Sequence, residues 1–155
     1  MHPIKFANVR ILIVEDVPVN REILRLQLQR LGCQVVDEAA NGSEALERFQ
    51  RYVYDIVFMD CQMPIMDGYQ ATEILRQQEA RQVEAPQPQH TIIIAFTAYT
   101  AAGHRARCLA VGMDDFLLKP VSTRSLEAVL TRWLTQRAID TDNRSNRIAK
   151  AMNPH

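Results

Sequence analysis

Hydrophobic residues along the chain gather into short runs that alternate with longer amphipathic stretches. The clearest run covers residues 56–59, four apolar residues that stop at Asp60. A short apolar run with a polar end is typical of a strand buried on both faces, as in a parallel sheet. We predict further strands over residues 9–14, 34–38, 91–96 and 116–118.

Stretches with helical periodicity lie between these strands. We predict helices over residues 18–31, 42 onward, 69–79, 101–111 and 122–134. Pro18 suits the first turn of a helix and Gly32 its end, while Asn41 with Glu44 three residues later resembles a capping box. Ser122 is expected to cap the last helix. Alternating strands and helices predict an α/β fold with one parallel sheet and helices on both faces.

The chain is expected to hold one domain, because 155 residues suit a single hydrophobic core with a short extension. We place this domain at residues 1–136. From residue 137 to 155 the sequence turns polar and loses its periodicity, which predicts a C-terminal tail or linker. Residues 83–89 form a polar connection interrupted by prolines.

Composition narrows the classes of partner. Lys and Arg together number 18, and so do Asp and Glu, so no excess charge favours nucleic acid or an anionic membrane. No segment is long and apolar enough for a signal peptide or a membrane span, which predicts a cytoplasmic location. A connection to a membrane would come from another polypeptide or from a portion of the protein missing here. The three cysteines show no metal-type spacing and fit a reducing compartment, and the four histidines are scattered.

Polar residues follow four of the predicted strands. The carboxyl ends of parallel strands share one edge, so these residues should converge; they are Glu15, Asp16, Asp60, Thr97 and Lys119. Carboxylates in one pocket repel each other, and Mg²⁺ relieves that repulsion. A lysine and a hydroxyl would suit the oxygens of a phosphoryl group, and an ionised carboxylate is already nucleophilic. The set predicts phosphoryl transfer onto Asp60.

Each of these residues also has a simpler interpretation. Asp60 or the Glu15 and Asp16 pair could merely cap a helix. Thr97 could bond the next turn, and Lys119 alone could be a solvated lysine. Two further residues near the site, Phe116 and Cys61, could be ordinary core residues, the cysteine as a buried inert thiol.

The sequence resembles the receiver domains of two-component response regulators. The resemblance covers residues 9–134 and rests on residues 12–16, 59–68, 97–98 and 112–120, in that order. It implies a flavodoxin-like (βα)5 fold with a five-stranded parallel sheet of order 2-1-3-4-5. It also implies that Asp60 accepts a phosphoryl group from a phosphohistidine, and that Lys119 and Pro120 are joined by a cis peptide bond.

Further roles follow from the same resemblance. Glu15, Asp16 and Asp60 would bind Mg²⁺ together with the backbone carbonyl of Gln62. Thr97 and Lys119 would contact the phosphoryl group. Thr97 and Phe116 would change conformation on activation.

The resemblance is strongest to receivers attached to hybrid sensor histidine kinases, because of Asn20 and residues 112–115. The partner would then be a histidine kinase or a histidine phosphotransfer domain. The first helix carries a second apolar stripe beside the one that can face the sheet, and this stripe could dock the partner's helix bundle. The docking residues we expect are Val19, Asn20, Ile23, Leu26 and Pro120. The alternative is that the stripe is core beneath the last helix.

Several functions remain open at this point. The chain could be part of a hybrid histidine kinase or a stand-alone response regulator that acts by binding proteins. An aspartyl-phosphate hydrolase would want an acid where Gln62 stands, and a flavin-binding module would want a phosphate loop where Glu15 and Asp16 stand. No output domain is visible, because the residues after the last predicted helix are too few for a DNA-binding module.

Overall fold

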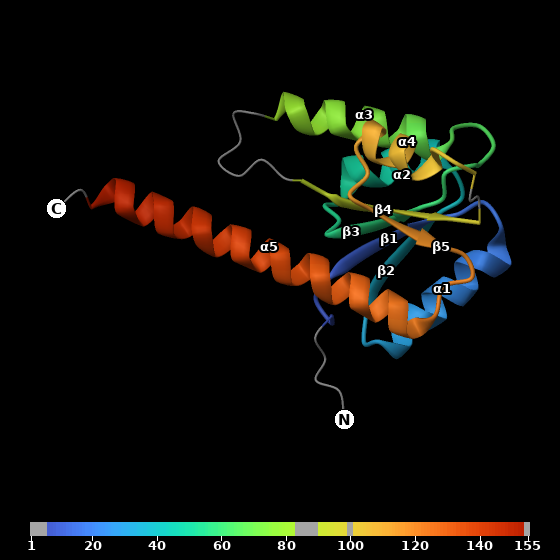
Figure 1. The fold of residues 1–155 in the computed structure, drawn as a ribbon, viewed down its shortest axis with the longest axis horizontal. Coiled ribbons are helices and arrows are strands. Elements are labelled where there is room, and N and C mark those ends of the chain that lie inside the picture. Colours follow the sequence, from blue (N-terminus) through green and yellow to red (C-terminus); the bar gives the residue numbers. More distant parts are fainter. Residues whose placement is uncertain (1–5, 83–89, 99–100, 154–155) are drawn as a thin grey trace. The chain divides into compact units, whose positions relative to one another are not determined.

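Strands and helices alternate along the whole chain, as predicted (Figure 1). The computed structural model describes residues 6–82, 90–98 and 101–153. Within that part of the chain there are five strands and five helices. The strands are β1 (Arg10–Val14), β2 (Val35–Ala39), β3 (Ile56–Met59), β4 (Ile92–Thr97) and β5 (Asp115–Leu118). The helices are α1 (Pro18–Arg30), α2 (Gly42–Arg51), α3 (Gly68–Arg81), α4 (His104–Val111) and α5 (Thr123–Met152). The predicted connection over residues 83–89 lies outside the described residues.

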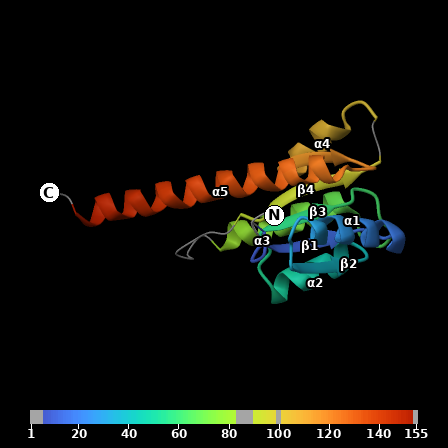
Figure 2. The ribbon, with the colours of Figure 1, turned by 90° about the horizontal axis from the view of Figure 1, so that it is seen from below.

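The five strands form one parallel sheet of order β2-β1-β3-β4-β5, which confirms the predicted flavodoxin-like order (Figure 2). Val14 pairs with Met59 and with Ala39. Thr97 pairs with Leu118 at the other side of the sheet. The strands therefore end in register, and the residues that follow them meet at one edge.

The central strands β1 and β3 are buried on both faces, as their unbroken apolar sequences predicted: Ile11–Val14 and Ile56–Met59 are all 0% exposed. Helices α2, α3 and α4 lie together over one face of the sheet and α1 lies over the other (Figure 1). The core between the sheet and the first group of helices includes Val57, Tyr69 and Leu75.

Side-chain caps define several helix ends. Asn41 Oδ1 accepts a hydrogen bond from the Glu44 backbone N–H at 2.9 Å, and Ser122 Oγ accepts one from the Ser125 N–H at 3.0 Å, as predicted. Asp67 caps α3 by accepting a hydrogen bond from the Gln70 N–H at 2.9 Å. The fourth helix begins at His104 instead of residue 101, because Gly103 before it has a φ of 83°, outside the helical region.

The last helix is longer than the sequence predicted. We expected it to end near residue 134, but α5 continues to Met152. Residues 138–152 are all exposed, so this stretch has no buried apolar face. Periodicity detects a helix only through such a face, whereas backbone hydrogen bonds and helix-forming residues such as Ala149 and Lys150 need none. By its contacts the chain divides into two units, residues 1–121 and 122–155.

None of the helices in the described ranges combines the length and hydrophobicity that crossing a bilayer requires.

Candidate functional site

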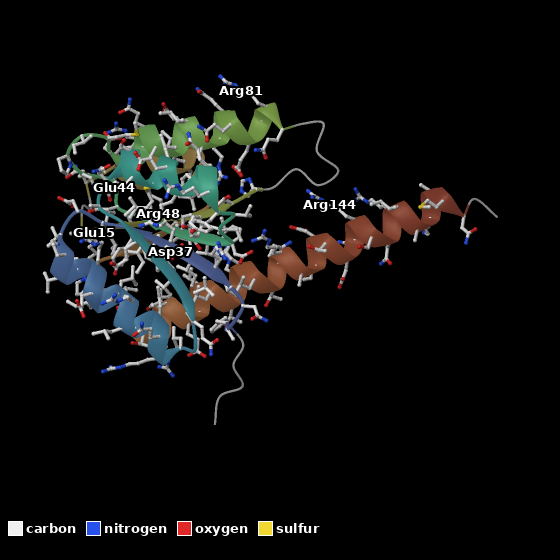
Figure 3. The ribbon with its side chains drawn as sticks, turned by 180° about the vertical axis from the view of Figure 1, so that it is seen from behind. Glu15, Asp37, Glu44, Arg48, Arg81 and Arg144 are labelled. Carbon is white, nitrogen blue, oxygen red and sulfur yellow. The ribbon has the colours of Figure 1, made fainter. Side chains whose placement is uncertain are left out.

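Backbone hydrogen bonds of the sheet continue past the strand ends and fix the polar residues there. The Asp60 N–H donates to the Val14 carbonyl at 2.9 Å, and the Glu15 N–H donates to the Ala39 carbonyl at 3.0 Å. Glu15 projects from the end of β1 (Figure 3). The backbones of Glu15 and Asp60 are therefore fixed by hydrogen bonds to neighbouring strands of the sheet.

The predicted convergence of charged residues is present. The Lys119 Nζ donates to Glu15 Oε2 at 2.5 Å and to Asp60 Oδ2 at 3.3 Å. Carboxylate oxygens of Glu15, Asp16 and Asp60 lie within 4.8 Å of one another. Three strands thus supply three acids and one lysine to a single site, and this acid set is one that could hold a hard divalent cation.

Side chains from the start of α1 support this site. The Asn20 Nδ2 donates to Glu15 Oε1 at 3.0 Å, and Arg21 Nη1 donates to the Glu15 carbonyl at 2.8 Å. The helix begins after Val17 without a side-chain cap. Glu15 and Asp16 therefore do not serve as caps for α1, which removes the simpler interpretation of this pair.

The two buried carboxylates differ in their electrostatics. Burial raises the pKa of Asp60 to about 7, and hydrogen bonding to Glu15 together with its charge adds to the rise. Burial also acts to raise the pKa of Glu15, but hydrogen bonds with Asp60, Lys119 and Asn20 outweigh it and hold that pKa below its usual value. Without a cation, Glu15 therefore stays ionised, whereas Asp60 gains and loses its proton near neutral pH.

The loop after Asp60 requires a glycine. A Cβ on Gly68 would lie 2.1 Å from the Asp60 carbonyl oxygen, so no larger residue fits there. The Gly68 N–H donates to the Cys61 carbonyl at 3.1 Å. The Gln62 N–H lies 3.4 Å from Asp60 Oδ1. This contact places the start of the loop directly beside the carboxylate.

The remaining predicted residues lie around this edge. Thr97 ends β4, is 2% exposed, and its carbonyl accepts from the Lys119 N–H at 2.9 Å. The bond between Lys119 and Pro120 is cis, as predicted. Phe116 is half-buried against the core and packs edge-on against the His104 ring, with centroids 5.6 Å apart.

Helix α1 shows the two predicted apolar faces. Leu24 and Leu28 are buried at 1% and 0% exposure. Val19, Ile23 and Leu26 are 60%, 53% and 46% exposed, so this second stripe is surface and not core.

Sequence reasoning missed two features near the site. Ile65 is 84% exposed in the loop after Asp60, with a φ of 72°. In addition, Cys61, Cys108 and His104 come together in the interior, where the thiols are 3.6 Å apart although 47 residues separate them in sequence. The only signal available beforehand was the spacing of His104 and Cys108, four residues apart on a predicted helix.

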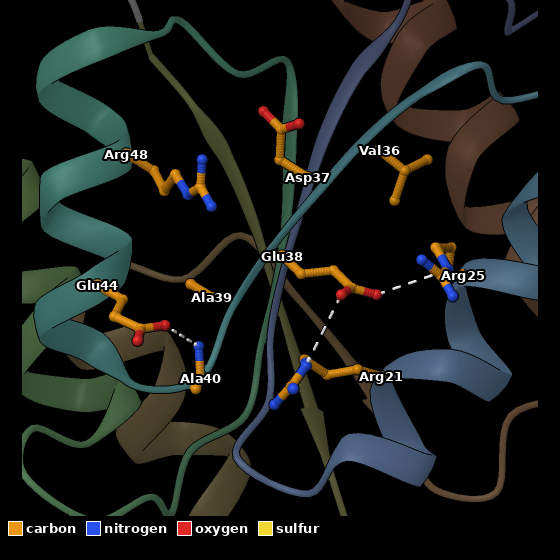
Figure 4. Close-up of a pocket in the computed structure, with 9 residues that line it drawn as sticks. All are labelled: Arg21, Arg25, Val36, Asp37, Glu38, Ala39, Ala40, Glu44 and Arg48. Carbon is orange, nitrogen blue, oxygen red and sulfur yellow. Dashed lines mark hydrogen bonds and ion pairs between the residues drawn. The ribbon is translucent and has the colours of Figure 1, made fainter.

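A separate polar pocket lies over the edge strand β2, between α1 and α2 (Figure 4). Its volume is about 410 Å³. Glu38 forms ion pairs there with Arg25 at 3.6 Å and Arg21 at 3.9 Å, and Glu44 accepts from the Ala40 N–H at 2.6 Å. Arg21 and Arg25 are thus paired with a carboxylate of the pocket itself, and the edge that holds Asp60 remains the stronger candidate for the functional site.

Residues 11–131 match the sequence model of the response regulator receiver domain. The chain belongs to the response regulator receiver domain family. Among curated relatives, this receiver is 40% identical over 124 residues to sensor histidine kinase GacS of Pseudomonas protegens, covering 80% of the chain and 13% of GacS. It is 41% identical to hybrid signal transduction histidine kinase B of Dictyostelium discoideum, covering 76% of the chain and 6% of that kinase. The receiver thus spans a small part of the kinases it resembles.

Two solved structures are also similar to this receiver. One is the receiver domain of sensor histidine kinase PA1611 from Pseudomonas aeruginosa PAO1, which holds magnesium in its active-site cleft. It is 38% identical to this chain with a TM-score of 0.71, and the match covers 83% of this chain and 99% of that one. The other is the Ssk1 receiver domain of Saccharomyces cerevisiae in complex with the histidine phosphotransfer protein Ypd1. It is 30% identical with a TM-score of 0.75, and the match covers 83% of this chain and 90% of that one. The receiver identity and the sheet order agree with the predictions made from the sequence.

Proposed function

We propose that this receiver takes a phosphoryl group from a phosphohistidine onto Asp60 within a phosphorelay. The single observation that carries the proposal is the position of Lys119 Nζ, 3.3 Å from Asp60 Oδ2 and 2.5 Å from Glu15 Oε2, at the edge where the strands end. In the reaction an Asp60 oxygen forms the new bond to phosphorus as the bond between phosphorus and the imidazole nitrogen breaks. Lys119 then balances negative charge on the phosphoryl oxygens, and the Thr97 hydroxyl donates a hydrogen bond to one of them.

The cation we propose is Mg²⁺, held by Glu15, Asp16, Asp60 and the carbonyl of Gln62. A hard cation with oxygen ligands suits this donor set, and it would neutralise charge on the carboxylates and the phosphoryl oxygens. Two observations support it: the carboxylate oxygens lie within 4.8 Å of one another, and the similar Pseudomonas aeruginosa receiver holds magnesium in its cleft. Asn20 and Arg21 keep Glu15 in place through their hydrogen bonds.

We further propose that the partner docks on the exposed stripe of α1. Val19, Ile23 and Leu26 begin three residues after Asp16, so a helix bundle seated on them can present its histidine to Asp60. Pro120 is exposed, and Asn20 faces Glu15. Ile65 extends the apolar surface on the loop that follows Asp60.

Phe116 would report the phosphorylated state by changing its rotamer together with Thr97. We place the domain at residues 1–136, within a hybrid histidine kinase of the kind its relatives represent and on the cytoplasmic side. A stand-alone regulator that acts by binding proteins is the alternative, and the full open reading frame distinguishes the two.

The direct test of the phosphoacceptor uses acetyl phosphate. Wild type and Asp60→Asn are incubated with acetyl phosphate, with Mg²⁺ or with EDTA, and weighed intact by mass spectrometry. We expect one phosphoryl adduct on the wild type with Mg²⁺, much less with EDTA, and none on the variant, which keeps its fold because the amide preserves the shape of the side chain. An adduct on Asp60→Asn, or an adduct that forms equally without Mg²⁺, would contradict the assignment.

A further inference from the structure

A second cluster of ligand-type side chains lies in the interior, separate from the acidic edge. Cys61 and Cys108 are 0% exposed, and His104 and Tyr69 are 5% exposed. The two sulfurs are 3.6 Å apart, and Cys108 Sγ is 4.0 Å from His104 Nε2. The Tyr69 hydroxyl lies 2.5 Å from His104 Nδ1 and 3.4 Å from Nε2. These groups come from the loop after β3, from α3 and from α4.

Helix α4 places a histidine and a cysteine at its two fully buried positions. The buried residues of this helix are His104 and Cys108, whereas Leu109 is 49% exposed. A helix that packs through the hydrophobic effect places its apolar residues inward; in α4 the partly buried Val111 packs against the core in this way. The spacing of four residues puts the imidazole and the thiol on the same face, one turn apart. The two fully buried positions on this face of α4 are thus metal-ligand side chains, and Val111 continues the face as a partly buried apolar residue.

Two of the three ligand separations lie close to the edges of a tetrahedron around a metal ion, and all three ligand atoms lie within 4.8 Å of one another. Bond lengths of about 2.3 Å to sulfur and about 2.05 Å to nitrogen put two thiolates about 3.8 Å apart, and a thiolate and an imidazole nitrogen about 3.6 Å apart. The observed separations are 3.6 Å between the sulfurs and 4.0 Å between Cys108 Sγ and His104 Nε2. We propose that Cys61, Cys108 and His104 form a binding site for a thiophilic divalent cation, Zn²⁺, with the Tyr69 hydroxyl beside the fourth position.

The chemistry of the cluster selects this class of cation. Thiolate and imidazole ligands suit zinc, whereas Mg²⁺ prefers oxygen ligands such as those at the acidic edge. Two thiolates balance the charge of one divalent cation, so the occupied site carries no net charge into the interior. The thiol protons leave to solvent on binding.

Occupation would connect the acidic edge with α4. Cys61 directly follows Asp60 in the chain, and His104 packs edge-on against Phe116 with centroids 5.6 Å apart. A cation bound by Cys61 and by two residues of α4 would tie the loop after Asp60 to that helix. The site is therefore placed to hold the loop after Asp60 against α4.

The test titrates the reduced, metal-free full chain with Co²⁺, a spectroscopic substitute for zinc, in excess Mg²⁺ to fill oxygen-rich sites. We expect one equivalent of Co²⁺ to bind with the thiolate charge-transfer absorption that carboxylate-bound cobalt lacks, and Zn²⁺ to displace it. Cys61→Ser and Cys108→Ser should each weaken binding by at least about 100-fold, and Tyr69→Phe by less. Hydrogen exchange of α4 amides should slow when Zn²⁺ is added.

The control is Cys33→Ser, because Cys33 is a third buried cysteine outside the cluster, and it should bind like the wild type. A folded wild type that shows no thiolate–cobalt absorption would overturn the proposal, whatever the variants do. Absorption that survives Cys61→Ser with Cys108→Ser, or disappears in Cys33→Ser, would overturn it as well. Because the wild type alone decides the first outcome, misfolding of a variant cannot conceal a failure.

Discussion

Glu15 and Asp60 are both buried carboxylates beside Lys119, yet their pKa values move in opposite directions. Hydrogen bonds with Asp60, Lys119 and Asn20 outweigh the effect of burial at Glu15, so its charged form is stabilised and its pKa is lowered. Asp60 has the longer contact to Lys119 and faces the charge of Glu15, and burial raises its pKa to about 7. Both acids could be identified from their positions after predicted strands. The difference between their pKa values depends on side-chain distances, which a pattern of strands does not predict. The proposed nucleophile, Asp60, is thus the acid whose charged form is stabilised less.

This difference predicts a pH dependence of stability in metal-free protein. Folded Asp60 binds its proton more tightly than the unfolded chain does, so its contribution is complete below pH 3.8 and is lost as the pH rises through about 7. Glu15 acts in the opposite direction, but only below its usual pKa of 4.5. In EDTA, the free energy of unfolding of the wild type should therefore fall relative to Asp60→Asn between about pH 5 and about pH 7. Urea melts of both proteins at each pH give their free energies of unfolding. If these free energies change in parallel with pH, Asp60 does not titrate between about pH 5 and about pH 7.

At the scale of elements, helix α1 shows what hydrophobic periodicity can predict. The 3.6-residue repeat separated a buried face from an exposed stripe, and Leu24 and Ile23 indeed lie at 1% and 53% exposure. The start of α4 was predicted less well, because it is set by Gly103, whose backbone conformation leaves no pattern in side-chain hydrophobicity. Patterns of burial therefore predict faces well and predict ends only where a cap or proline marks them.

Because the stripe of α1 is exposed, we expect a substitution there to weaken partner recognition and to leave stability nearly unchanged. Ile23→Ala should change the free energy of unfolding by no more than about 0.5 kcal/mol, because the side chain lies on the surface. It should slow phosphoryl transfer from a histidine phosphotransfer domain by about fivefold or more, as expected for an apolar contact worth about 1 kcal/mol. Labelling by acetyl phosphate, which needs no docking, should be unchanged. Chemical melts and rapid-quench transfer assays give these quantities.

Two control variants accompany Ile23→Ala. Leu24→Ala removes the neighbouring buried side chain and should cost about 2–5 kcal/mol of stability. Val53→Ala removes an equally exposed apolar side chain, at 54% exposure, from the loop before β3 at the opposite edge of the sheet. It should leave both stability and transfer unchanged. Docking on α1 would be refuted if Val53→Ala slowed transfer as much as Ile23→Ala.

For the whole molecule, alternation of short apolar runs and amphipathic stretches was enough to predict the parallel α/β sheet. The strand order and the cis bond before Pro120 came from the family resemblance, and both are confirmed. Two features were not predicted from the sequence, each for a different reason. The end of α5 is an exposed helix without an apolar face, and the cluster of Cys61 and Cys108 joins residues that only the folded chain brings together.

The domain boundary we propose can be tested by truncation. Residues 138–153 are all exposed and Arg137 is half-buried, so a chain that ends at Gln136 loses no fully buried side chain of the described structure. A chain that ends at Gln136 should unfold within about 0.5 kcal/mol of the full chain, the size of ordinary surface changes. It should also be labelled by acetyl phosphate at the same rate. A large loss of stability or labelling would extend the domain into the C-terminal half of α5.

The most direct measurement follows the phosphoryl group from a phosphohistidine to this chain. A histidine phosphotransfer domain is phosphorylated by its kinase, freed of nucleotide, and mixed with the receiver and Mg²⁺. Borohydride then reduces the acyl phosphate to homoserine, and peptide sequencing by mass spectrometry locates it. We predict homoserine at residue 60 alone in the wild type, and no transfer to Asp60→Asn. Homoserine at another acid, or transfer to Asp60→Asn at the wild-type rate, would contradict the assignment of Asp60 as the phosphoacceptor.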